Sequence, residues 1–136
     1  MDNQILFIGL DVDDNAYHGG AVSEDGKHEF EFKCKPTVGA LTQKIKSYEG
    51  RGFKIKVCYE ATFVGFSLSR NLRARGFDCE VIAPSLVPRK PGEQVKTDRL
   101  DGNKLSRYYR SGDLTTVHMP SQEEETVRYL VRIFRQ

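Results

Sequence analysis

The chain of 136 residues is long enough for one ordinary domain and too short for two independent hydrophobic cores. Hydrophobic residues make up 38% and charged residues 29%, a composition that argues against a wholly disordered chain. No apolar run approaches the roughly 18 residues that a membrane span needs, so we expect no membrane association, and the first residues show no signal-peptide pattern. The 3 cysteines are spaced neither for a zinc knuckle nor for a disulfide framework, which favours a reducing, cytoplasmic compartment.

The net charge of +2 conceals an uneven distribution. Residues 1–33 contain eight acidic and two basic residues, whereas residues 34–136 carry a net charge of +8. The densest basic stretch, residues 89–110, is typical either of a solvated surface or of a surface that binds a phosphodiester backbone. The composition leaves both interpretations open. The seven cations of this stretch are Arg89, Lys90, Lys96, Arg99, Lys104, Arg107 and Arg110.

Strands and helices follow from the periodicity of apolar residues. Residues 5–12 form a nearly unbroken apolar run, which predicts a strand buried on both faces. The Asp25-Gly26 pair between two extended stretches predicts a hairpin. Helical spacing from Val38 to Tyr48 predicts a helix that ends at Gly50. The expected elements are strands at 5–12, 17–22, 28–33, 53–60 and 79–82, and helices at 38–48, around 68–72 and at 98–110, with a proline-rich loop before the last.

This order predicts the α/β class, with a three-strand antiparallel meander, two parallel strands and flanking helices. The first strand is expected beside a parallel fourth strand. Residues 1–118 are the expected domain, and residues 119–136 the start of a linker or coiled helix. A capping box at Ser121 and Glu124 begins that helix, and its apolar stripe still runs at the end of the chain. We therefore expect the amino-terminal piece of a longer protein, or else a final helix that dimerises.

Acidic residues interrupt this pattern where the chemistry of a site is expected. Asp11 ends a buried strand and Glu60 ends the fourth strand, and parallel neighbours bring both to one edge of the sheet, where ligands bind in open α/β sheets. Asp98 and Asp101 stand three residues apart at a predicted helix start and share a face. Each has a structural alternative: Asp98 as a helix cap, Asp101 as a partner of the helix dipole, Asp11 as a turn cap, and Glu60 as a plain surface residue.

Carboxylates that converge from separate segments repel one another unless a cation lies between them. Ligation by oxygen alone favours Mg²⁺ or Mn²⁺, and two such ions assist in-line phosphoryl displacement. Asp13 is a rival or accessory ligand if the first strand continues past Val12. Residues 11–22 fail as an EF-hand loop, because Ala16 and Val22 stand where Gly and Glu are required. The three histidines are scattered and expected at the surface or in turns, and Cys58 is expected in the core.

The acids and their flanks resemble one family. The stretches at 7–12, 59–62, 95–101 and 104–114 are similar to the RuvC-like, ribonuclease-H-fold domain of the insertion-sequence-110 transposases, relatives of the Piv invertases. The departures include Phe63-Val64 before Gly65, and Gly102 where alanine is usual, a change expected to weaken the helix slightly. The resemblance implies a metal tetrad of Asp11, Glu60, Asp98 and Asp101.

The resemblance also implies a function for the longer protein. Members of the family resemble recombinases that are guided by a structured bridge RNA and assemble as oligomers on DNA. A second domain supplies their serine nucleophile, so the present chain would hold half an active site. Three alternatives stay open: a free-standing nuclease that resolves branched DNA, a module that binds nucleic acid and oligomerises without catalysis, and half of an actin-like ATPase.

Overall fold

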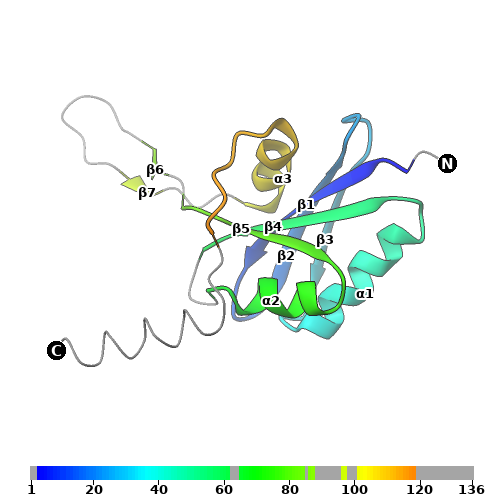
Figure 1. The fold of residues 1–136 in the computed structure, drawn as a ribbon, viewed down its shortest axis with the longest axis horizontal. Coiled ribbons are helices and arrows are strands. Elements are labelled where there is room, and N and C mark those ends of the chain that lie inside the picture. Colours follow the sequence, from blue (N-terminus) through cyan, green and yellow to red (C-terminus); the bar gives the residue numbers. More distant parts are fainter. Residues whose placement is uncertain (1–2, 62–64, 85, 88–95, 98–100, 119–136) are drawn as a thin grey trace.

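The computed structural model describes residues 3–61, 65–84, 86–87, 96–97 and 101–118 (Figure 1). Within these residues, five strands form one mixed sheet in the order β3-β2-β1-β4-β5, flanked by helices. The predicted α/β class and its ribonuclease-H-like arrangement of strands are confirmed. The elements of this domain are β1 (Ile5–Val12), β2 (Tyr17–Ser23), β3 (Glu29–Cys34), α1 (Val38–Glu49), β4 (Lys54–Glu60), α2 (Ser67–Ala74), β5 (Asp78–Ile82) and α3 (Gly102–Ser111).

β1 is the central strand of the sheet. It pairs antiparallel with β2 and parallel with β4, as the sequence predicts. β2 continues into β3 through a turn in which Gly26 has a φ of 76°, a left-handed conformation that glycine adopts without strain. β5 pairs parallel with β4. The carboxyl ends of β1, β4 and β5 therefore share one edge of the sheet.

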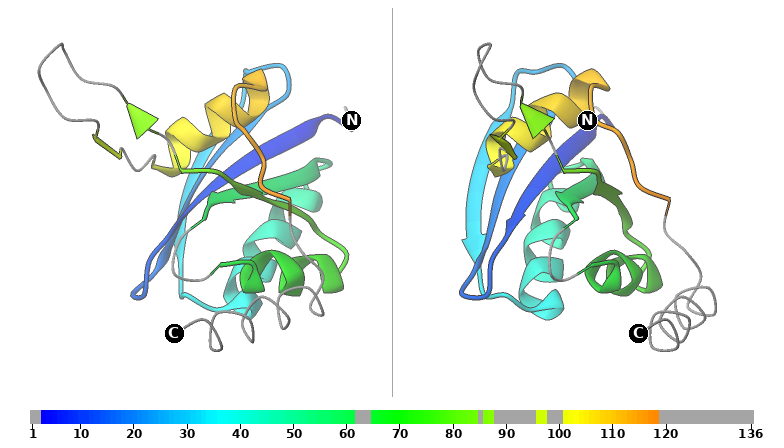
Figure 2. Two further views of the ribbon diagram at one scale, coloured as in Figure 1. Left: turned by 60° about the vertical axis from the view of Figure 1, so that its left-hand side comes forward. Right: turned by 90° about the vertical axis from the view of Figure 1, so that its left-hand side faces the viewer.

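The helices cover the two faces of the sheet unequally. Of the three described helices, α1 and α2 lie on one face and α3 lies on the other (Figures 1 and 2). The main apolar core fills the space under α1 and α2. The Tyr59 hydroxyl donates to the Gly65 carbonyl at 2.7 Å and accepts from the Ser69 N–H at 3.1 Å, which ties β4 to the start of α2. The fully buried members of this core include Leu6, Ile8, Leu10, Leu41, Ile45, Val57, Tyr59 and Leu72.

Two features of the described chain were not predicted. Residues 115–117 run antiparallel along the outer edge of β5, where the Val117 N–H donates to the Val81 carbonyl at 2.7 Å and Thr116 bridges Ile82. This segment covers an edge that would otherwise leave backbone groups unpaired. Within the stretch expected to be loop, β6 (Leu86–Val87) pairs antiparallel with β7 (Lys96–Thr97) in a separate two-stranded sheet.

The last helix starts later than predicted. α3 begins at Gly102 rather than at residue 98, because the Asp101 side chain caps the helix there and its backbone is extended, with φ −73° and ψ 170°. Residues 98–100 and 119–136 lie outside the described residues, and so do the expected linker and its capping box. No helix in the described ranges is long and apolar enough to cross a bilayer. All three cysteines are free thiols.

Candidate active site

Asp11 and Glu60 lie next to each other at the carboxyl ends of the two central parallel strands. The register of β1 and β4 pairs Leu10 with Tyr59, so the next residue on each strand is one of these acids. Neighbouring strands are about 4.8 Å apart. Both side chains belong to the α3 face, because their neighbours two positions back, Gly9 and Cys58, contact or underlie α3. The arrangement of parallel neighbours that the site requires is therefore present.

Both carboxylates are withdrawn from water. Glu60 is 6% exposed, and Asp11 is half-buried with its Oδ1 atom shielded from solvent. A buried carboxylate is costly unless hydrogen bonds or opposite charge compensate it. Two carboxylates on adjacent strands are the kind of donor set that a hard divalent cation binds.

Asp101 brings a third carboxylate to the same region from α3. Its carboxylate accepts a hydrogen bond from the Lys104 N–H at 2.8 Å and so forms the amino-terminal cap of the helix. As structural alternatives, the sequence suggested Asp98 as the helix cap and Asp101 as a residue favoured by the helix dipole. Asp101 is the cap, and Asp98 lies outside the described residues.

A cavity of about 290 Å³ opens beside these acids, and Asp11 and Asp101 both line it. His18 lies on β2 directly opposite Asp11 and lines the same cavity. Asn103 and Glu31 also line this cavity, and the side-chain amide of Asn103 donates a hydrogen bond to the Glu31 carboxylate. A second cavity of about 350 Å³ adjoins it through these two residues and extends to Ser106 and Arg107. The two cavities together follow α3 from the acids toward its basic side chains.

His18, Glu31 and Asn103 line the first cavity and were not predicted as site residues. His18 was expected at the surface, and it is exposed. The signal for its position was available in the β1–β2 hairpin, because the tight turn between Val12 and Tyr17 fixes Asp11 opposite His18. No comparable local signal places β3 beside α3, since that contact depends on how the last helix packs.

Three glycines let α3 sit directly on the sheet. A Cβ atom on Gly9 would lie 2.6 Å from the Gly102 carbonyl oxygen, and one on Gly102 would lie 2.7 Å from backbone atoms of both Gly9 and Gly20. These distances leave no space for any side chain between the first turn of α3 and strands β1 and β2. The slight weakening of the helix expected at Gly102 stays a prediction, and the structure adds a second property of this residue, which is that it permits this contact. The glycine contact sets the position of Asp101.

Asp13 does not extend the set of acids along the strand. β1 ends at Val12, and the Asp13 carboxylate accepts a hydrogen bond from the Asn15 N–H at 3.0 Å in the turn. The condition for an accessory ligand, a strand that continues past Val12, is not met. Among the described residues, no group of three or more His, Cys, Asp or Glu side chains is arranged to hold a metal ion.

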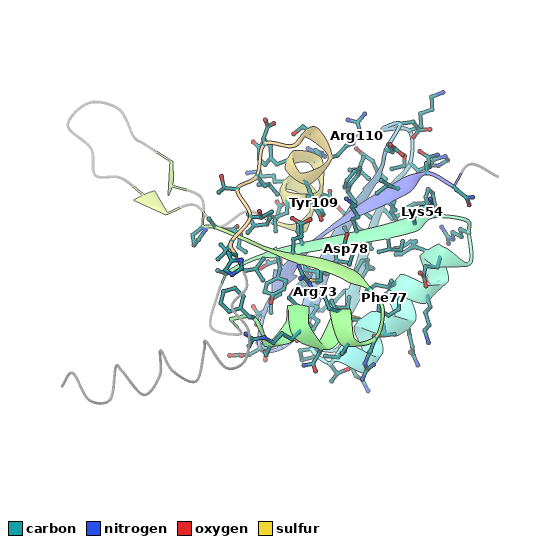
Figure 3. All side chains as sticks on the ribbon, in the orientation of Figure 1. Lys54, Arg73, Phe77, Asp78, Tyr109 and Arg110 are labelled. Carbon is teal, nitrogen blue, oxygen red and sulfur yellow. The ribbon has the colours of Figure 1, made fainter. Side chains whose placement is uncertain are left out.

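Four of the seven cations predicted to bind nucleic acid lie among the described residues. Lys104 and Arg107 are exposed on α3. Arg110 is also exposed, but its Nε donates to the Glu24 carbonyl at 3.0 Å and so ties α3 to the β2–β3 hairpin (Figure 3). Lys96 belongs to β7. Arg89, Lys90 and Arg99 lie outside the described residues.

Tyr109 and Cys58 are two further titratable groups between α3 and the sheet. Tyr109 packs edge-on against Phe7, with ring centroids 5.4 Å apart, and points from α3 toward the sheet (Figure 3). Burial, and secondarily the negative charge of Glu80, raises the pKa of the Tyr109 hydroxyl. Cys58 is fully buried, as predicted, and burial raises the pKa of its thiol well above the usual range. Neither group is an available base at neutral pH.

Comparison with known proteins relates the chain to transposases. It is 37% identical over 134 residues to "Putative transposase y4qE" of Sinorhizobium fredii, a match that covers 96% of this chain and 34% of that protein. It is 30% identical over 129 residues to the transposase for insertion sequence element IS1533 of Leptospira borgpetersenii, covering 93% of this chain and 37% of that protein. The chain thus spans about a third of the length of the curated relatives it matches. No family model matches the sequence.

Proposed function

We propose that this chain is the metal-binding catalytic domain of a DNA transposase, and that it contributes to cleavage and exchange of DNA strands. The observation that carries the proposal is the placement of Asp11 and Glu60 side by side at the ends of β1 and β4. The similarity of nearly the whole chain to proteins named transposases gives these acids a substrate class.

The proposed ligands of Mg²⁺ or Mn²⁺ are Asp11, Glu60, Asp98 and Asp101. All four offer carboxylate oxygen, the donor type that both ions prefer. Such an ion, when bound, stabilises the attacking and leaving oxygens of a phosphoryl displacement. The protein's own part is to hold the carboxylates in fixed positions: β1 and β4 hold two of them, and the capped start of α3 holds Asp101.

The basic side chains are proposed to bind the phosphate backbone without reading its sequence. This role is assigned to Lys104, Arg107 and Arg110 on α3, and to Arg89, Lys90, Lys96 and Arg99 in the preceding segment. A structured guide RNA and assembly as a homo-oligomer are further parts of the proposal, and both are supported only by the family resemblance. Sedimentation of the protein with and without DNA tests the assembly.

The test of the metal site is calorimetric titration of Mg²⁺ and Mn²⁺ into wild type, Glu60→Gln and Glu80→Gln. Glu80 is the matched control. It lies on the neighbouring strand β5, opposite Cys58, and so belongs to the same face of the sheet as Glu60. We expect Glu60→Gln to weaken metal binding at least tenfold and Glu80→Gln to leave it unchanged. Equal affinity in wild type and Glu60→Gln would refute the assignment.

A separate measurement distinguishes the alternatives. Cleavage of branched DNA by this chain alone would favour a free-standing nuclease. Salt-sensitive DNA binding that survives loss of all four acids, without any metal binding, would favour a non-catalytic module.

A further inference from the structure

Two adjacent tyrosines on α3 differ in their surroundings. Tyr109 packs against Phe7 under the helix, which accounts for its place in the fold. Tyr108 is 43% exposed, and it is the one large apolar side chain in the described residues that is exposed to this degree. Tyr108 is not a member of either apolar cluster of the described residues.

Two exposed cations of α3 are close to Tyr108 in sequence. Lys104 precedes it by one helical turn and lies on the same face, and Arg107 is its neighbour in sequence; both are exposed. The ten residues of α3 include three cations and no acid. An aromatic ring among cations is the composition of surfaces that bind single-stranded nucleic acid, in which bases stack on the ring and phosphates meet the charges.

The ring also lies within reach of the proposed catalytic acids. Tyr108 is seven residues beyond Asp101, which places it roughly 10 Å along the helix axis from the acid cluster. A single strand held at Asp101 and laid along α3 would reach the ring within a few nucleotides.

We propose that Tyr108 is a stacking platform for an unpaired base of single-stranded DNA, with Lys104 and Arg107 holding the flanking phosphates. The choice of DNA rests on the proposed function. The choice of a single strand follows from the chemistry of the ring, because a base that is paired and stacked within a duplex offers no free face to it.

The composition of the chain provides a direct probe. The sequence contains no Trp, so Tyr108→Trp creates a single fluorophore at the platform. The matched control is Gln43→Trp, an exposed position on α1, across the sheet from α3. We expect an oligo-dT of about 12 nucleotides to quench Trp fluorescence in Tyr108→Trp and to leave the control unchanged. Duplex DNA of the same length should quench far less.

Affinity measurements complete the test. Tyr108→Phe should bind oligo-dT like wild type, because it keeps the ring, whereas Tyr108→Ala should bind roughly 5- to 100-fold more weakly. Wild-type affinity in Tyr108→Ala, equal quenching in the control, or equal quenching by duplex would overturn the proposal. Tighter binding of oligo-U than of oligo-dT would overturn the assignment to DNA.

These outcomes are separable from those of the metal site. Tyr108→Ala should bind Mg²⁺ like wild type, because the ring is remote from the carboxylates. Glu60→Gln combined with Tyr108→Trp should still be quenched by oligo-dT in the absence of a divalent ion. If the wild-type chain bound no divalent ion while oligo-dT still quenched Tyr108→Trp, the proposed function would be contradicted and the stacking platform would stand. If the wild-type chain bound metal while oligo-dT left Tyr108→Trp unquenched, the stacking platform would be contradicted and the metal site would stand.

Discussion

The two faces of the central sheet carry different kinds of residues, although they are formed by the same strands. Along β1, Leu6, Ile8 and Leu10 face α1 and α2 and are at most 1% exposed. The alternate residues face α3: Phe7 packs against Tyr109, Gly9 lies under the start of the helix, and Asp11 follows near the end of the strand. One face is filled with large apolar side chains, and the other is reduced to backbone under the start of α3 and ends in acids.

This difference indicates how the domain divides its tasks. Burial of large aliphatic and aromatic side chains under α1 and α2 supplies most of the stability. The α3 face has only a small apolar cluster, centred on Cys58, Ile82 and Leu105. Its close backbone contact is needed for position rather than for buried area. We expect substitutions on the first face to change stability and substitutions on the second to change ligand binding as well.

The largest expected effect is on the α1–α2 face. Ile8→Ala removes a side chain that is fully buried, and we expect the free energy of unfolding to fall by about 2–5 kcal/mol. Urea unfolding, followed by circular dichroism, measures this loss. Below its unfolding transition the variant should bind Mg²⁺ with wild-type affinity. Weakened binding in the folded variant would show that the two faces are not independent.

Alternation explains why the sequence predicted the sheet and the first two acids. The apolar run of β1 and the alternating pattern of β4 each fix a strand locally, and the short Asp-Gly turn fixes the β2–β3 hairpin. Asp11 and Glu60 were then predicted to be neighbours because each stands at the end of one of these strands. These signals are local, so they can be recognised without knowledge of the rest of the fold.

The α3 face could not be predicted in the same way. Its geometry depends on the packing of a helix far along the chain against β1 and β2. No local sequence pattern around Gly102 predicts that this residue contacts Gly9 and Gly20. The helix start was misplaced because Asp98 and Asp101 are both good caps, and only the packed helix shows that Asp101 is used. The edge-covering segment 115–117 likewise depends on long-range pairing.

The next effect, in order of size, concerns the glycine contact. Gly102→Ala places a Cβ against backbone atoms of β1 and β2, which cannot yield as a flexible side chain can. We expect a loss of about 1–3 kcal/mol in the free energy of unfolding. Because α3 must shift to relieve the contact, Asp101 should move away from Asp11 and Mg²⁺ affinity should fall. Calorimetry on the folded variant measures this second effect.

Gly39→Ala is the control for that substitution, since no atom lies within 4 Å of a Cβ at Gly39. It should be as stable as wild type or slightly more so. If Gly102→Ala lowered stability and left metal affinity intact, the glycine contact would be structural only and would have no part in positioning the acid.

A smaller effect separates the two roles of Asp101. Asp101→Ala removes a helix cap and should lower the free energy of unfolding by about 1 kcal/mol. Asp101→Asn keeps the capping oxygen and should keep the stability, yet it removes the charge that a divalent cation needs. Both variants should bind Mg²⁺ more weakly in calorimetry. Retained affinity in Asp101→Asn would limit Asp101 to capping.

Thr37→Ala is the corresponding change on the other face. The Thr37 hydroxyl accepts from the Ala40 N–H at 3.1 Å and caps α1. It should cost a similar amount of stability and leave metal binding untouched. Any loss of metal affinity here would mean that capping by itself, and not the charge at α3, controls the site.

The smallest effect needs no substitution. Cys58 lies under α3 and Cys79 lies in the α1–α2 core on the neighbouring strand, and both are fully buried. Burial raises the pKa of the Cys79 thiol to about 12 and that of Cys58 well above the usual range, so at pH 8 both are protonated in the folded protein. Reaction with a thiol reagent then requires opening of the structure, and the face that opens more easily exposes its cysteine sooner.

Because α3 covers Cys58 with few apolar contacts, we expect Cys58 to react before Cys79, after the half-buried Cys34. Mass spectrometry of peptides from timed samples gives each rate. Mg²⁺ should slow the reaction of Cys58 more than that of Cys79, since an ion bound at the proposed site would link α3 to β1 and β4 and so disfavour opening of this helix. Equal rates for Cys58 and Cys79, with equal protection by Mg²⁺, would mean that both faces open together in global unfolding, and the division between a stabilising face and a separately held functional face would not hold.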